Sequence, residues 1–123
     1  MVSDITVWVD GTKVPFYDTH PIKIRGRVMV PLRGVFQQME ATVNWDAATR
    51  VVTAHKEGYD IELSLNNPRA HVNGKTVILD VPATEFHDRV VVPIRFIGEA
   101  LGAHVKWEKE TGSVLIETSP PPR

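Results

Sequence analysis

The sequence predicts an α+β fold of two pseudo-symmetric, β-rich units, each with one short helix packed on a twisted antiparallel sheet. The first observation is an internal repeat, because residues 27–54 align without a gap with residues 89–116. The matched positions are Arg27/Arg89, Val28/Val90, Val30/Val92, Pro31/Pro93, Arg33/Arg95, Ala41/Ala103, Val43/Val105, Trp45/Trp107, Thr49/Thr111 and Val52/Val114. The second observation is a pair of hairpin signals between apolar runs, Asp10-Gly11 and Asn73-Gly74. Glycine accepts the positive φ that tight hairpin turns require.

The composition limits the class of protein. A chain of 123 residues fits one domain, or two small domains that share a core. The formal net charge of −1 lacks the basic footprint of a nucleic-acid binder, so no nucleic-acid partner is expected. No apolar run has the length of a membrane span, so no membrane insertion is expected. The absence of cysteine excludes disulfides and thiolate chemistry without fixing the compartment.

The first unit is predicted to begin with a hairpin, in which residues 5–9 form one strand and residues 13–16 return. Residues 17–26 are interpreted as a polar connection and residues 27–30 as a short strand. Pro31 ends this strand and opens a helix, because its missing N–H costs nothing in the first helical turn. The apolar face of this helix is Leu32, Val35, Phe36 and Met39.

The first unit continues with a second predicted hairpin, formed by residues 41–45 and 50–55. Residues 60–65 alternate apolar and polar side chains, which is typical of a half-buried strand. This strand is expected to lead from the first unit into the second.

The second unit repeats this order, with a hairpin over residues 70–79, a connection over residues 80–88, a strand over residues 90–92 and a helix opened by Pro93. The apolar face of the helix is Ile94, Ile97 and Leu101. Gly102 is expected to end this helix in a left-handed conformation. Glu40 stands at the corresponding position of the first unit, so that helix is expected to end in a different way.

Neither half could bury much core alone, so the halves are predicted to fuse into one domain over residues 1–118. Its repeats are about 5–65 and 66–118, and a last hairpin is formed by residues 104–107 and 113–117. Short connections favour antiparallel neighbours, so an antiparallel sheet is expected. Residues 119–123, Ser-Pro-Pro-Pro-Arg, are predicted to be a Pro-rich linker stub.

The strings VDGTKV, RVMVPLR, VNGKTV and RVVVPIRFIGEALGAHVKWE resemble the copper amine oxidase N-terminal-domain-like family, also called the stalk domain. The resemblance covers roughly residues 5–117. PLRGVFQQMEATVNW is a looser copy, which departs at Gly34 and at residues 38–40. The resemblance implies a sheet twisted around a helix and a non-catalytic accessory module of secreted or envelope-attached bacterial proteins. Copper and quinone chemistry belongs to a separate catalytic domain, whose Asn-Tyr-acid cofactor motif and His-x-His ligand pair have no match here.

Local patterns for metal binding or catalysis are missing from the sequence. The histidines are His20, His55, His71, His87 and His104, and no two of them stand at i, i+2 or i, i+4. No Gly-x-Ser-x-Gly elbow occurs. We therefore expect no catalytic residue, no metal ligand and no cofactor. The alternative is a long-range site in which pseudo-symmetry brings His20 and His87 together.

Arg33 and Arg95 stand at corresponding corners between strand and helix. They could bind anions, since a guanidinium forks onto a carboxylate or phosphate. They could instead bond to carbonyls or carboxylates of their own units, with Asp46 and Glu108 as partners. Duplication of the arginine in both units favours this structural interpretation.

Trp45 and Trp107 end corresponding strands. One interpretation makes them buried plugs that close the two helix–sheet interfaces, and the other makes them exposed platforms that stack on sugar rings. Their repetition favours the core. Trp8, Tyr17 and Tyr59 are the better candidates for an interaction surface. The predicted structural signature of the repeat is therefore Pro31, Arg33, Trp45, Pro93, Arg95 and Trp107.

These observations predict a non-catalytic scaffold or interaction module that is secreted or lies at the cell surface, with no signal peptide in this segment. The expected partners are neighbouring domains or surface proteins, a glycan, and a second copy of the chain paired through sheet edges. A carbohydrate or cell-wall binding module is the alternative. A small hydrolase or metal-dependent enzyme assembled from both units is a third hypothesis.

Overall fold

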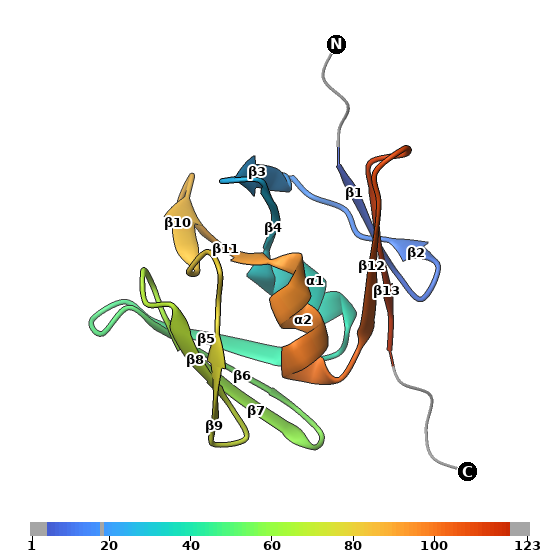
Figure 1. Ribbon diagram of the computed structural model, residues 1–123. Coiled ribbons are helices and arrows are strands. Elements are labelled where there is room, and N and C mark those ends of the chain that lie inside the picture. Colours follow the sequence, from blue (N-terminus) through green and yellow to red (C-terminus); the bar gives the residue numbers. More distant parts are fainter. Residues whose placement is uncertain (1–4, 18, 119–123) are drawn as a thin grey trace.

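The computed structural model describes residues 5–17 and 19–118, which form short strands and two helices (Figure 1). In chain order the elements are β1 (Thr6–Val9), β2 (Thr12–Lys13), β3 (Ile22–Ile24), β4 (Arg27–Pro31), α1 (Leu32–Gln38), β5 (Thr42–Asp46), β6 (Val51–Lys56), β7 (Tyr59–Ser64), β8 (Arg69–Val72), β9 (Lys75–Ile78), β10 (Thr84–Phe86), β11 (Arg89–Pro93), α2 (Ile94–Leu101), β12 (His104–Glu108) and β13 (Ser113–Glu117). Among the described residues no helix is long and apolar enough to cross a membrane. The predicted linker stub at residues 119–123 lies outside the described residues.

The strands form three sheets, with the orders β12-β13-β1-β2, β10-β11-β4-β3 and β5-β6-β7-β8-β9. The first sheet joins the hairpin β1-β2 from the first half of the chain to the hairpin β12-β13 from the second half. In the third sheet, β7 lies between the hairpin β5-β6 and the hairpin β8-β9. In the second sheet β4 pairs antiparallel with β11, so that Val30 lies opposite Val92. The fold is thus broadly α+β, as predicted, and is mostly antiparallel sheet around two short helices.

The two helices lie among the three sheets (Figure 1). Helix α1 contacts β1, β4, β5 and β11, and α2 contacts β4, β7, β11 and β12. The predicted apolar faces are buried, except that Ile94 is half-buried. Phe36 of that face in α1 and Phe96 of α2 are fully buried. Burial of each ring contributes about 1.5–3 kcal/mol to the free energy of folding. One hydrophobic cluster contains buried residues from both helices and all three sheets.

The hairpin turns follow the sequence prediction. Asp10 and Gly11 have φ of 48° and 84°, and Asn73 and Gly74 have φ of 52° and 80°. Both turns therefore place two successive residues in the left-handed region, as tight turns between twisted strands require.

Two strands were not predicted, since β3 and β10 lie inside segments interpreted as connections. Each has three residues, which is too short for alternation of side chains to be recognised. Their turns into the next strand again use left-handed residues, Arg25-Gly26 and His87-Asp88. The polar character of these turns hid the strands on either side.

The pairing of β1 with β13 corrects the expectation of an antiparallel sheet. These strands run parallel, with Thr6 opposite Ser113 and Val9 opposite Ile116. Parallel strands need a long connection. Almost the whole chain lies between these two, so no short loop imposes an antiparallel direction on them.

The two helices have different caps, as expected, but share one left-handed position. Helix α1 is capped by Met39, with φ −89° and ψ 11°. Gly102 ends α2 with φ 65° and ψ 25°, as predicted. Glu40, after α1, has φ 66° despite carrying a side chain. An L-residue in this conformation costs about 1–2 kcal/mol. Glycine is more strongly required at position 102 than at position 40, because a β-carbon on Gly102 would collide with the hydroxyl of Tyr59.

Glycines inside the helices meet different surroundings. A β-carbon on Gly98 of α2 would lie 2.8 Å from the backbone oxygen of Ala103. A β-carbon on Gly34 of α1 would lie 3.6 Å from the ring of Phe16, which is an ordinary contact. Close approach of the backbone therefore requires glycine only in α2.

Candidate functional site

The arginines at the helix starts lie on the surface. Arg33 and Arg95 are both exposed, and Arg33 Nη1 donates to the carbonyl of Val43 in its own unit at 3.4 Å. The predicted acidic partners are wrong. Asp46 Oδ1 accepts the amides of the turn after β5, and Glu108 Oε2 lies 3.5 Å from Lys106 Nζ.

The tryptophans are less buried than predicted. Trp45 is 38% exposed, which contradicts its expected role as a core plug. Trp107 is half-buried and packs against the main core. Val43 and Trp45 share one face of β5, but only Val43 packs against the core. Trp45 stands two residues further on, where it lines a hollow on the protein surface beside α1.

Two grooves are built from corresponding residues of the repeat. The Trp45 groove, of about 500 Å³, is lined by Pro31, Arg33 and Trp45 of the first unit and by Arg89 and Glu85 of the second. The Trp107 groove, of about 740 Å³, is lined by Pro93, Arg95 and Trp107 of the second unit and by Arg27 and Lys23 of the first. The structural signature residues therefore meet in two matched hollows, and each hollow uses both halves of the chain.

The two grooves differ in what covers the indole. In the Trp107 groove the Lys23 ammonium lies 5.6 Å from the centre of the Trp107 ring, and Arg27 forms an ion pair with Asp80 at 3.1 Å. Glu85 replaces Lys23 in the Trp45 groove, where a carboxylate cannot make a cation–π contact. Glu85 Oε1 instead pairs with Arg50 at 3.3 Å.

The Trp45 groove contains one unpaired buried hydroxyl. Thr19 is only 4% exposed, and its Oγ1 has no hydrogen-bond partner among the described residues. Tyr17, also part of the lining, is 85% exposed. The polar side chains of Gln37 and Gln38 in α1 complete this side of the groove. No sequence pattern indicated Thr19, because a threonine in a polar connection is expected to be solvated.

The three predicted interaction residues do not meet. Tyr17 lines the Trp45 groove, but Trp8 and Tyr59 do not. Trp8 is half-buried on β1, and its Nε1 donates to Thr6 Oγ1 at 3.1 Å. Tyr59 is half-buried at the start of β7 and packs against the end of α2 at Gly102.

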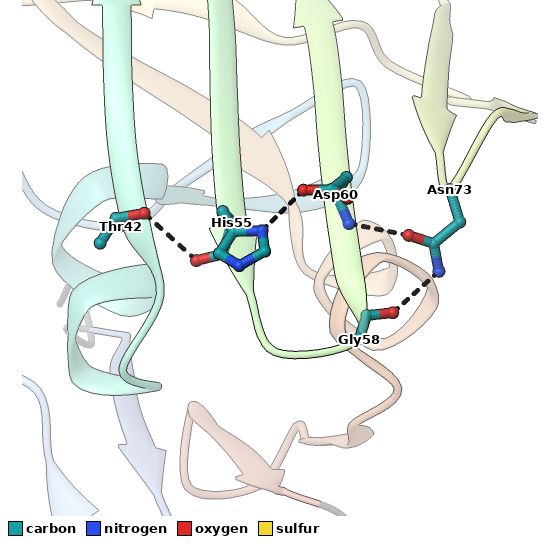
Figure 2. A network of polar contacts seen from close by, with 5 residues as sticks. All are labelled: Thr42, His55, Gly58, Asp60 and Asn73. Carbon is teal, nitrogen blue, oxygen red and sulfur yellow. Dashed lines mark hydrogen bonds and ion pairs between the residues drawn. The ribbon is translucent and has the colours of Figure 1, made fainter.

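A polar network covers part of the five-stranded sheet (Figure 2). His55 Nδ1 and Asp60 Oδ1 are 2.6 Å apart, and Thr42 Oγ1 donates to the His55 carbonyl. Asn73 accepts the Asp60 amide through Oδ1 at 2.8 Å and donates to the Gly58 carbonyl at 3.0 Å. These contacts fasten neighbouring hairpins to one another. Among the described residues no group of three or more His, Asp or Glu side chains is arranged to hold a metal ion.

The first and last strands are fastened by a side chain. Asp10 Oδ2 accepts the Thr118 hydroxyl at 2.6 Å, and Asp10 Oδ1 accepts the Thr118 amide at 2.9 Å. The hydrogen bond from the Thr118 hydroxyl lowers the pKa of Asp10 below its ordinary value of 3.8, and the bond from the Thr118 amide lowers it further. Desolvation opposes this shift, whereas the positive charge of Lys56 adds to it. This carboxylate therefore ties the turn after β1 to the residue after β13.

Comparison with known proteins gives one finding. The family described as the copper amine oxidase N-terminal domain matches residues 8–116. A search of curated proteins found no match.

Proposed function

Because the chain belongs to the copper amine oxidase N-terminal domain family, we propose that it is a non-catalytic scaffold that joins neighbouring domains or surface proteins and carries tension between them. The family description names the N-terminal domain of an oxidase, and the resemblance of the sequence to stalk domains supports a role without turnover. We further place the module outside the cell or at its surface, on the resemblance of its sequence to stalk domains.

One observation carries this proposal: the parallel pairing of β1 and β13, which we call the terminal strand pair. In Figure 1 the two strands run side by side. Because they are parallel, the chain enters β1 at one end of the pair and leaves β13 at the other. Segments attached before β1 and after β13 would therefore point in opposite directions, as a spacer requires.

The same geometry sets how the module would resist a pull. Tension between the two ends would slide β1 along β13, so all their paired residues would be loaded together. The terminal strand pair runs from Thr6–Ser113 to Val9–Ile116. Two backbone hydrogen bonds extend the pair at its ends. The Thr6 amide donates to the Gly112 carbonyl at 2.9 Å, and the Asp10 amide donates to the Ile116 carbonyl at 2.8 Å. Forced unfolding depends on the height of the unfolding barrier, which simultaneous loading raises.

A local twofold relation between the two halves of the chain would explain why both ends of the chain lie in the same domain. We infer this relation from β4 and β11, because the corresponding residues Val30 and Val92 lie opposite each other. The outer strands β9 and β12 leave edges at which a second copy of the chain could pair. Ile78 at the end of β9 is 63% exposed, which suits that edge for such a contact.

Single-molecule force spectroscopy tests the proposal in two pulling geometries. In the first, the domain is pulled through its two ends. In the second, it is pulled through its N-terminal end and a cysteine at Glu110, an exposed turn residue at the same end of the terminal strand pair; the chain has no cysteine of its own. We expect a clearly higher unfolding force in the first geometry, because the second separates the strands pair by pair. Equal forces would refute a load-bearing role.

A further inference from the structure

We propose that the Trp45 groove binds an oligosaccharide of pyranose rings. This binding site does not depend on the load-bearing role, since it lies between α1, β5 and the connection after β2 rather than at the terminal strand pair. The Trp107 groove, with the same frame, serves as its internal comparison.

The buried hydroxyl of Thr19 points to a ligand that forms hydrogen bonds. A buried polar atom without a partner destabilises the folded protein, and such atoms are rare in native proteins. Thr19 Oγ1 is in this state, and Thr19 is one of the residues that line the groove. A hydroxyl can both donate and accept, so a sugar hydroxyl would satisfy it once ring binding shifts the side chains that cover this atom.

The exposed indole of Trp45 indicates the shape of that ligand. A flat aromatic face that is left in water is suited to stack on a flat, weakly polar surface. The C–H face of a pyranose ring is such a surface, and its edge carries hydroxyls. Tyr17 presents a second exposed ring at the same groove. A peptide partner would be expected at a sheet edge or in an apolar cleft, whereas this groove combines aromatic faces with polar groups.

The rim supplies planar hydrogen-bonding groups. Gln37 and Gln38 are exposed in the last turn of α1, and each amide offers both a donor and an acceptor. Arg33 adds an exposed guanidinium, which binds carboxylates well. We therefore expect an acidic sugar chain to bind more tightly than a neutral one.

The Trp107 groove should not bind the same ligand, although it has the matched arginine and tryptophan. Lys23 already occupies the face of its indole, and the Arg27–Asp80 pair spans its wall. A sugar ring would have to displace both contacts. The repeat thus provides a matched control within one protein.

Titrations with chitotetraose and with tetragalacturonate, followed by NMR and calorimetry, test the proposal. We expect millimolar binding, with the acidic tetramer favoured, since few contacts are involved. Trp45→Ala should weaken binding by roughly tenfold or more, which corresponds to one central aromatic contact. Trp107→Ala should leave affinity within about twofold.

Thr19→Val separates the binding role from a structural one. Valine keeps the shape and removes the unpaired hydroxyl, so thermal stability should be unchanged or higher. Affinity for the tetramer should fall about fivefold or more, the loss of roughly one hydrogen bond. The proposal would be overturned by no binding of either tetramer up to roughly 20 mM, or by equal losses in the Trp45 and Trp107 variants. It would also be overturned if a peptide or another ligand class bound this groove while neither sugar did.

Discussion

Replacement of Asp10 by asparagine should weaken the closure of the terminal strand pair in a pH-dependent way. The change keeps a residue that tolerates the left-handed φ of 48° but removes the charge that accepts two bonds from Thr118. Hydrogen bonds to a charged group contribute about 1.5–3 kcal/mol when buried, and much less on an exposed surface. We expect a loss of about 1 kcal/mol in the free energy of unfolding at pH 7.

The direction of the pH effect follows from the lowered pKa of Asp10. Its folded pKa lies below the ordinary value of 3.8, so its contribution is fully present above about pH 4. That contribution disappears as the pH falls through the folded pKa. The difference between Asp10→Asn and the parent protein should therefore be largest near pH 7 and smaller at pH 2.5, below the ordinary pKa of an aspartate.

Urea unfolding followed by tryptophan fluorescence measures this difference at both pH values. Thr118→Val should lose about half as much stability as Asp10→Asn, because the hydrogen bond from the Thr118 backbone amide to Asp10 remains. Asn73→Ala is the matched control, since Asn73 occupies the corresponding hairpin turn and its amide does not titrate. An Asp10→Asn loss of the same size at pH 7 and pH 2.5 would refute the role of the carboxylate.

Two further predictions concern backbone positions. Glu40→Gly should stabilise the protein by about 0.5–1 kcal/mol in a thermal melt, because glycine relieves the left-handed strain. Gly102→Ala should destabilise the protein in the same assay. Stabilisation by both changes would contradict the geometry. Gly34→Ala should be neutral or stabilising by up to about 1 kcal/mol through better helix propensity, whereas Gly98→Ala should cost more than about 1 kcal/mol because a backbone oxygen lies too close. Similar melting temperatures for these two alanine variants would count against the packing of α2.

Local patterns in the sequence predicted the parts of the fold that depend on near neighbours. The apolar spacing from Leu32 to Met39 identifies a buried helical face, whatever lies against it. Asp10-Gly11 and Asn73-Gly74 identify turns because glycine permits their backbone angles. The family was also recognisable, since its motifs are continuous strings.

Features that depend on distant residues could not be read in this way. The parallel pairing of β1 with β13 joins segments more than a hundred residues apart, and the strands themselves carry no sign of it. Trp45 and Trp107 look equivalent in the sequence, yet the environment of each ring depends on a residue of the other unit. Lys23 covers one indole, and Glu85 at the corresponding place leaves the other exposed.

The candidate site also required the three-dimensional structure. Arg33 was singled out from the repeat, but its exposure was not predictable from a strand-to-helix corner. Thr19 acquired interest only because folding buries its hydroxyl without a partner. Glu40 in place of glycine predicted a different end for α1, but only the structure shows that Glu40 itself adopts the left-handed φ of Gly102.

Native-state hydrogen exchange of the Asp10 amide tests the central claim most directly, namely that the terminal strand pair is an integral part of one cooperative body. This amide donates to the Ile116 carbonyl across the pair, and the Asn73 amide, which donates to Asp60 in the five-stranded sheet, is the reference. We expect both amides to exchange only through global unfolding, with free energies that agree within about 1 kcal/mol. Exchange of the Asp10 amide through a local opening of much lower free energy would show that β1 separates from β13 on its own, and would contradict the account.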